Sequence, residues 1–220
     1  TAQAKGELVE ALSPTGTAAL NADDPRVAQM ATRTAARILT FGKQGQVRLL
    51  GPVQLDDLGQ PQFDLEVDGV RYAAKVPQVG AHHAINAAAA VAAVLALGVG
   101  AAAAVASLAS ATAASPMRME RKVRPDGVVV LNDAYNANPE SMSAALHALA
   151  QIAPDSGVAV LGEMLELGQH SAAAHRQIGE LAASLGIKKV IAVGAGASAI
   201  AQGAGEVGHA VTDISGAIAW

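Results

Sequence analysis

The second half of the chain alternates short apolar runs with longer amphipathic segments, and this alternation limits the possible folds more than any other feature. The apolar runs span 128–131, 158–161 and 190–193, with a further one near Val211, and the amphipathic segments span 141–149 and 171–185. Alternating strands and helices are typical of a parallel sheet joined by right-handed crossovers. Continuous apolar runs indicate strands that are covered on both faces. We therefore predict an α/β fold with a parallel sheet in this half.

A polar loop joins the first of these strands to the following helix. Asn138 is a suitable N-cap, Pro139 suits the first helical position, and the apolar residues that follow fall on one helical face, namely Met142, Ala145, Leu146 and Leu149. The loop, residues 132–138, therefore lies at the carboxyl end of a strand, where open α/β sheets bind ligands. Asn, Asp and Pro are also ordinary turn residues, so the loop alone is equally consistent with a plain connection.

The first half of the chain mixes helices with strands and hairpins. We predict helices over 1–12, 26–33, 80–98 and 101–111, strands over 17–20 and 38–41, and antiparallel hairpins over 46–79. Asp68-Gly69 is the expected tight turn within the hairpins. In the helix over 80–98, the expected packed face consists of Ile85, Ala88, Ala92 and Leu95. Ser115-Pro116 marks a domain boundary, which divides the chain into domains 1–114 and 115–220.

Composition excludes several classes of partner. The net charge is -4 and the sequence pI is about 5.8, without a basic cluster of the kind that binds nucleic acid. The absence of cysteine excludes disulfides and thiolate metal sites and fits a reducing cytoplasm. The alanine-rich tract 84–114 is interrupted by Asn86 and by Gly98-Val99-Gly100, which indicates two buried helices rather than a membrane span.

Both ends of the sequence have the character of interior segments. The chain begins with Thr1 in a helical pattern that has no N-cap, and it ends at Trp220 within another helical pattern. No charged and apolar signal-peptide pattern is present at the start. We therefore expect the chain to be a fragment of a longer protein.

Two further patterns leave other functions open. Adjacent His82 and His83 could indicate a metal site, although neighbouring side chains on a helix diverge and no third ligand is close in sequence. The run 194–199 fits the dinucleotide-binding pattern G-x-G-x-x-A, with Asp213 further on, as in an NAD-type oxidoreductase. It occurs late in the α/β half, whereas that pattern normally occupies the first strand-to-helix turn. A non-catalytic nucleotide-binding module is the third open alternative.

Four segments resemble signature motifs of the Mur ligase family. They are AKGE at 4–7, GAHHAIN at 80–86, the segment 118–142 that ends in DAYNANPESM, and LGEMLELG at 161–168 with His175 downstream. The resemblance spans nearly the whole chain. It implies an ATP-dependent amide ligase, in which a substrate carboxylate attacks the γ-phosphate and an amine then attacks the acyl phosphate. NANPESM and LGEMLELG most resemble the members that add D-alanyl-D-alanine to UDP-N-acetylmuramoyl-tripeptide in peptidoglycan synthesis.

The resemblance also implies an architecture. Residues 1–114 would be the latter part of a mixed-sheet ATP-binding domain, and residues 115–220 a Rossmann-like C-terminal domain with a parallel sheet. The phosphate loop of the family, G-x-x-x-x-G-K-[ST], does not occur in these 220 residues. We therefore expect the chain by itself to be inactive, and the whole protein to be a cytoplasmic monomer without a membrane span.

Roles for seven residues follow from the same resemblance. Asn86 would meet the adenine of ATP, Arg118 its phosphates and Asp133 its ribose. Tyr135, Asn136 and Asn138 would face the incoming dipeptide. Lys5 would react with CO₂ to form a carbamate that helps to hold Mg²⁺, because the carbamate is an oxygen-rich anion suited to a hard cation. Lys5 and Arg118 would thus be the residues most directly involved in catalysis.

Overall fold

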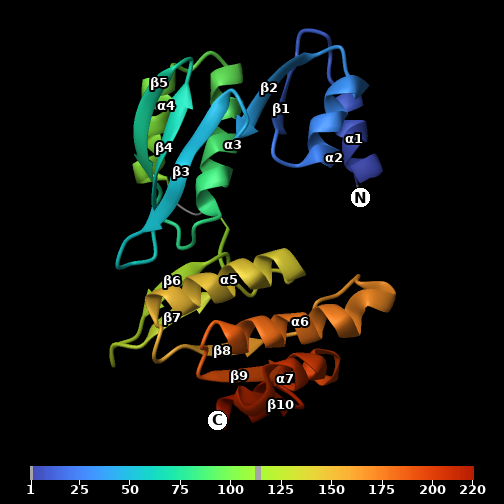
Figure 1. Ribbon diagram of the computed structural model, residues 1–220, viewed down its shortest axis with the longest axis vertical. Coiled ribbons are helices and arrows are strands. Elements are labelled where there is room, and N and C mark those ends of the chain that lie inside the picture. The colour runs from blue at the N-terminus through green and yellow to red at the C-terminus, as the bar shows by residue number, and fades with distance from the viewer. Residues whose placement is uncertain (1, 112–114) are drawn as a thin grey trace. The chain divides into compact units, whose positions relative to one another are not determined.

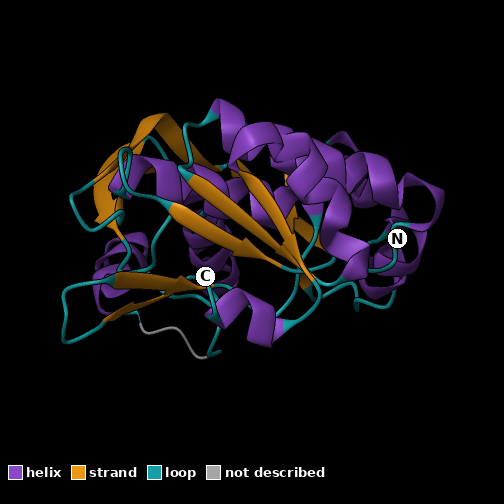
Figure 2. Cartoon of the chain, turned by 90° about the horizontal axis from the view of Figure 1, so that it is seen from below, coloured by secondary structure: helices purple, strands orange, loops and turns teal. Residues whose placement is uncertain are grey.

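The computed structural model describes residues 2–111 and 115–220, and these form two compact units (Figure 1). Unit 1 comprises Thr1–Asp56 and Gln60–Thr112, and unit 2 comprises Asp57–Gly59 and Ala113–Trp220. The expected boundary at Ser115-Pro116 lies close to the point where the chain passes from unit 1 to unit 2, and the division into domains 1–114 and 115–220 stays a prediction. Helices and strands occur together in each unit, which confirms the α/β class (Figure 2).

Unit 1 contains a five-stranded mixed sheet with the order β1-β2-β3-β4-β5. Its strands are β1 (Thr17–Asn21), β2 (Arg37–Gly42), β3 (Val47–Leu55), β4 (Pro61–Val67) and β5 (Val70–Lys75). The first three strands run parallel, and β3, β4 and β5 pair antiparallel, as expected for the hairpins. Asp68 and Gly69 have φ values of 51° and 76°, which is the backbone conformation that a two-residue hairpin turn requires. The expected tight turn is confirmed.

The helices of unit 1 pack against this sheet mainly through α3. They are α1 (Ala2–Glu10), α2 (Pro25–Ala28), the 3₁₀ turn η1 (Gln29–Arg33), α3 (His83–Ala96), α4 (Ala101–Ser107) and the 3₁₀ turn η2 (Leu108–Ser110). The predicted helix over 26–33 is therefore split into an α-helical and a 3₁₀ part. Among the described residues the longest helices have 14 residues, and none is long and apolar enough to cross a membrane.

The packed face of α3 differs from the prediction. Its buried residues are Ala84, Ala87, Ala88, Val91 and Ala92, whereas Ile85 and Leu95 are only partly buried. The expected face was wrong by part of a turn. In an alanine-rich helix almost every position is apolar, so the sequence pattern defines the direction of the core poorly.

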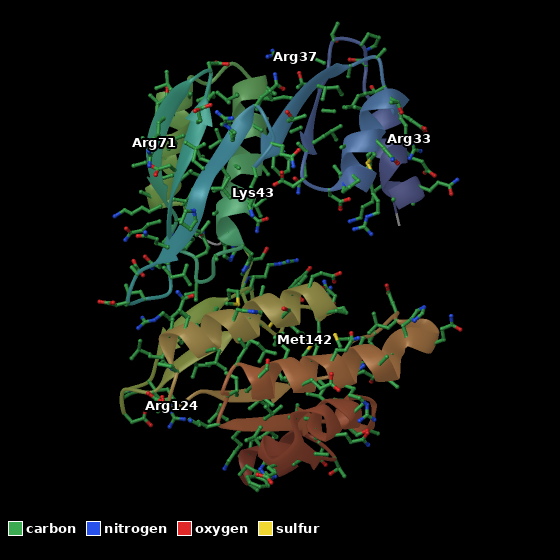
Figure 3. The ribbon with its side chains drawn as sticks, in the orientation of Figure 1. Arg33, Arg37, Lys43, Arg71, Arg124 and Met142 are labelled. Carbon is green, nitrogen blue, oxygen red and sulfur yellow. The ribbon has the colours of Figure 1, made fainter. Side chains whose placement is uncertain are left out.

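Unit 2 contains a parallel three-stranded sheet with the order β10-β9-β8, which confirms the parallel sheet expected from the alternation. Its strands are β8 (Val158–Leu161), β9 (Lys189–Val193) and β10 (Gly208–Val211). Its helices are α5 (Pro139–Ile152), α6 (Ser171–Ser184), α7 (Ser198–Ala204) and α8 (Ile214–Ile218), with short 3₁₀ turns η3 (Gly168–His170), η4 (Ala195–Ala197) and η5 (Gly205–Val207). The core includes Met142 of α5, which lies between α5 and α6 (Figure 3), together with Ile178 and Ile200.

The apolar run 128–131 forms a strand, but in a different sheet from the one predicted. β7 (Val129–Asn132) pairs antiparallel with β6 (Glu120–Val123) in a separate two-stranded sheet. Val128, Val129 and Val130 are exposed, so the expectation of a strand covered on both faces was wrong. The Pro125-Asp126-Gly127 turn explains the difference, because it closes a hairpin in which the Arg124 N–H donates to the Val128 carbonyl oxygen at 2.9 Å. An apolar run predicts a strand without identifying its partner.

Candidate functional site

The open end of the β6–β7 hairpin brings three of the predicted site residues together. Arg118 lies just before β6, and Asp133 and Tyr135 follow β7. The guanidinium carbon of Arg118 lies 4.0 Å from the centroid of the Tyr135 ring, a distance that allows a cation–π interaction. Both side chains are exposed, and among the described residues Arg118 has no carboxylate partner. The positive charge is thus fixed in direction and available to an anionic ligand.

Hydrogen bonds to the main chain hold Arg118 in this position. The Tyr135 N–H donates to the Met117 carbonyl oxygen at 3.1 Å, and the Met119 N–H donates to Asp133 Oδ1 at 2.9 Å. The two residues that flank Arg118, Met117 and Met119, have φ values of 58° and 48°. This left-handed conformation is unfavourable for residues other than glycine and persists where the surroundings impose it. Such strain is common at binding sites, where it orients a functional group.

Asp133 has a structural task that the sequence analysis did not assign. Its carboxylate accepts the hydrogen bond from Met119, so at least one of its oxygens holds the main chain beside Arg118. The donor, Met119, lies 14 positions before Asp133 in the chain, and no sequence motif indicates that these two residues form a hydrogen bond. The role of Asp133 toward a ribose stays a prediction.

Asn138 begins α5, as the sequence predicted. Its Oδ1 accepts a hydrogen bond from the Ser141 N–H at 2.8 Å, and its own N–H donates to Ser141 Oγ at 3.1 Å, which together form a capping box. The preceding Asn136 is exposed, and in the described part of the chain its side chain has no hydrogen-bond partner. Three residues were expected to face a dipeptide. Of these, Tyr135 and Asn136 have side-chain polar groups without a hydrogen-bond partner among the described residues, whereas the side-chain oxygen of Asn138 already accepts a hydrogen bond from Ser141.

Lys5 and Asn86, the other predicted site residues, lie in unit 1. Lys5 is exposed on α1, and Asn86 is exposed on the first turn of α3. Neither side chain has an ion-pair or hydrogen-bond partner among the described residues. Exposure without a partner is also the state of an ordinary surface lysine, so the carbamate at Lys5 stays a prediction. Residues 2–111 and 115–220 contain no group of three or more His, Asp or Glu side chains arranged to hold a metal.

Gly6, next to Lys5, is required by a packing contact that the sequence analysis missed. Arg33 of η1, labelled in Figure 3, crosses α1 at this glycine. Its Nε donates to Glu10 Oε1 at 2.7 Å, and its Nη1 donates to the Gln3 carbonyl oxygen at 3.2 Å. A Cβ atom on Gly6 would lie 1.7 Å from Arg33 Nη1. Arg33 therefore fixes the helix that carries Lys5.

We expect Gly6→Ala to lower the free energy of unfolding of unit 1 by about 1 kcal/mol or more, because the added methyl group displaces the Arg33 guanidinium. In an Arg33→Ala background the same change should instead raise it by about 0.5 to 1 kcal/mol, since alanine is the better helix former once the clash is gone. Chemical denaturation followed by circular dichroism measures both. If Gly6→Ala changed the free energy of unfolding in the same direction with and without Arg33, the packing role of Gly6 would be contradicted.

The paired histidines at the start of α3 contact each other with tilted rings. The ring centroids of His82 and His83 are 4.2 Å apart. Burial, and to a smaller extent the charge of His82, lower the pKa of His83 to about 4. His83 is therefore neutral at pH 7. In the described part of the chain no third ligand completes a metal site here, so the metal interpretation gains no support.

The glycine pattern at 194–199 has a structural explanation. Gly194 has a φ of 92°, which favours glycine, and it ends β9 where η4 begins. A Cβ atom on Gly196 would lie 2.0 Å from the side-chain Cδ of Glu163, in the loop after β8. Backbone conformation and close packing thus account for both glycines without a dinucleotide.

A groove of about 800 Å³ in unit 1 lies apart from the predicted site residues. It is lined by residues of β3, β4, β5, α4 and η2, and neither Lys5 nor Asn86 is among them. In it, the Arg71 guanidinium donates a hydrogen bond to the Asp64 carboxylate and thereby lowers the pKa of that carboxyl group. These two charges satisfy each other, and Lys75 is the remaining charged residue of the lining.

Comparison with known proteins relates both units to one family. Residues 1–94 match the family described as Mur ligase middle domain, and residues 117–220 match the Mur ligase, glutamate ligase domain. The UDP-N-acetylmuramoyl-tripeptide--D-alanyl-D-alanine ligase of Mycobacterium tuberculosis strain H37Rv is 41% identical over 225 residues, covering 96% of this chain and 44% of the relative. The ligase of the same name from Escherichia coli strain K12 is 32% identical, covering 93% of this chain and 46% of the relative.

Solved structures give the same relation. The crystal structure of MurF from Acinetobacter baumannii matches with a TM-score of 0.84 at 31% identity, covering 96% of this chain and 45% of the other. The MurF ligase of Thermotoga maritima in complex with ADP matches with a TM-score of 0.77 at 25% identity. The match covers 90% of this chain and 45% of the other. The chain spans less than half the length of these relatives.

Proposed function

The chain belongs to the Mur ligase family, and on that basis we propose that the full-length protein joins D-alanyl-D-alanine to UDP-N-acetylmuramoyl-tripeptide at the expense of ATP. The identity of 41% over 96% of the chain to a ligase of that name supports this substrate pair. The structural observation that carries the proposal is the exposed guanidinium of Arg118, held over Tyr135 between two strained residues. A fixed planar cation suits the binding of phosphate groups.

Within this proposal, each unit corresponds to part of a domain. Residues 1–114 form the latter part of the middle, ATP-binding domain, and residues 115–220 form most of the C-terminal domain. The ranges that match the two family descriptions, 1–94 and 117–220, support the division. We propose that the protein acts in the cytoplasm and as a monomer.

The reaction forms an amide bond in two displacements. A carboxylate oxygen of the tripeptide attacks the γ-phosphorus of ATP, and ADP leaves with the electron pair of the broken P–O bond. The amine nitrogen of the dipeptide then attacks the acyl carbon, inorganic phosphate leaves, and the nitrogen gives up a proton. Catalysis of such steps consists mainly of positioning and of neutralising phosphate charge.

The residues of this chain divide that work. Arg118 neutralises charge on the phosphates, Asn86 contacts the adenine, and Asp133 accepts hydrogen bonds from the ribose while it holds the main chain at Met119. The carbamate of Lys5 would hold Mg²⁺, and the ion would neutralise further phosphate charge. Tyr135, Asn136 and Asn138 shape the dipeptide site.

The proposed function predicts strict dependence on three substrates. Full-length protein given ATP, UDP-N-acetylmuramoyl-tripeptide and D-alanyl-D-alanine should form one amide bond for each ADP released, as measured by mass spectrometry and a coupled ADP assay. Omission of the dipeptide should abolish the amide product. The 220 residues alone should form none, because the phosphate loop of the family is not among them. Binding of NADH, but not of ATP, would favour the oxidoreductase alternative instead.

A further inference from the structure

We propose that the carboxylate of Glu163 recognises the ammonium group of the incoming dipeptide, an inference that rests on the proposed function. Glu163 lies two residues after the end of β8, in the loop LGEMLELG. This is the carboxyl end of a strand in the parallel sheet of unit 2, where ligands of α/β folds bind. The residue is exposed, so its charge is accessible.

The Glu163 carboxylate lies close to Gly196, in the loop that follows β9. β8 and β9 are neighbouring parallel strands, so the loops that follow them, which carry Glu163 and Gly196, start from the same edge of the sheet. A Cβ atom on Gly196 would lie 2.0 Å from Cδ, 2.2 Å from Oε1 and 2.3 Å from Oε2 of Glu163. The carboxylate thus occupies the space that any side chain at 196 would fill. Gly196, within the glycine pattern at 194–199, therefore leaves space for the Glu163 carboxylate.

The main chain beside Glu163 is held from inside the core. His175 of α6 is fully buried, and its Nε2 accepts a hydrogen bond from the Met164 N–H at 2.8 Å. Its Nδ1 then carries the proton and donates to the Ser171 carbonyl oxygen at 2.8 Å. The Met164 side chain is also buried, with 1% of its surface exposed. The main chain next to Glu163 is therefore held in place.

The charge of Glu163 is uncompensated within the described structure. No Lys, Arg or His side chain of residues 2–111 and 115–220 forms an ion pair with it, and it has no hydrogen-bond partner there. An exposed anion without a partner repels ATP and the anionic parts of the UDP-linked substrate and attracts a cation. The dipeptide enters the reaction through its amino group, which is an ammonium ion near neutral pH. Contact with Glu163 would bring that nitrogen to the ligand-binding edge of the sheet.

The test compares Michaelis constants for the three substrates in the full-length protein. Glu163→Gln keeps the shape and removes the charge, and we expect it to raise the KM for D-alanyl-D-alanine about tenfold or more, since hydrogen bonds to charged groups are the strong ones. The KM values for ATP and for the UDP-linked tripeptide should stay within about twofold. Gly196→Ala, which pushes the carboxylate away, should have the same selective effect. Glu166→Gln, an exposed glutamate of the same loop, is the matched control and should change none of the three.

Each outcome of this experiment decides between stated alternatives. An unchanged KM for the dipeptide in Glu163→Gln overturns the inference, as does a rise confined to the UDP-linked tripeptide, which would place its diamino acid at Glu163 instead. If Gly196→Ala fails to fold by circular dichroism, the result for Glu163→Gln decides alone. Absence of any amide product from the unsubstituted protein would instead refute the proposed function, so the two failures are distinguishable.

Discussion

Lys5→Ala in the full-length protein is expected to lower the turnover number by about 100-fold or more, because the mutant cannot form the carbamate that would hold Mg²⁺ against the negatively charged phosphates. Lys5 is exposed on α1 and has no partner among the described residues, so CO₂ can reach its nitrogen. The neutral amine forms an N–C bond to CO₂ and releases a proton. The unmodified ammonium could not ligate Mg²⁺, which binds oxygen ligands.

Chemical rescue distinguishes this role from a general structural one. Short carboxylates such as acetate should restore part of the activity of Lys5→Ala, since they place an oxygen anion at the vacated position. Gln3→Ala, on the same exposed helix, is the matched control and should keep full activity. Full activity of Lys5→Ala without additive, or rescue by amines but not by carboxylates, would show that Lys5 is an ordinary surface residue.

Arg118→Ala is expected to lower kcat by about 100- to 1,000-fold, because its guanidinium is the fixed cation proposed to stabilise charge on the transferred phosphoryl group. Arg118→Lys should recover only part of the loss, since an ammonium cannot present two parallel donors or stack on Tyr135 as a planar group. Initial rates at varied ATP concentrations measure kcat and KM separately.

Two neighbours of Arg118 serve as controls. Arg121→Ala removes an exposed arginine from β6 of the same hairpin and should leave kcat unchanged within about twofold. Tyr135→Phe keeps the ring beneath the guanidinium, so it should retain the orientation of Arg118, whereas Tyr135→Ala should not. Equal activities for Arg118→Ala and Arg121→Ala would mean that the position of Arg118 has no catalytic importance.

The parts of the fold that the sequence predicted well are those encoded locally. Asn138 and Pro139 mark the start of α5 because capping and the proline ring act within one turn. Asp68-Gly69 marks the turn of a hairpin because only certain residues adopt left-handed conformations easily. The strand partner of β7 was not predictable in this way, since the run of valines contains no information on which neighbour it will meet.

The candidate site was predictable residue by residue but not as an arrangement. The sequence indicated a polar loop at Asp133 and Tyr135, and the family resemblance indicated Arg118. The left-handed conformations of Met117 and Met119 could not be read from the sequence, because methionine has no preference for them. The reason for Gly6 also escaped, since Arg33, which requires it, lies on another element.

The contacts of Met117 determine which substitutions can be accepted at this position during evolution. Both of its hydrogen bonds use main-chain atoms: its carbonyl oxygen accepts from Tyr135, and its N–H donates to Glu120. Its side chain is exposed. Selection at this position therefore acts on the shape of the backbone and hardly on the identity of the side chain. Glycine or asparagine, which adopt the left-handed conformation more readily, would serve there as well as methionine. Homologues can thus keep the arginine in place while this position appears variable in an alignment.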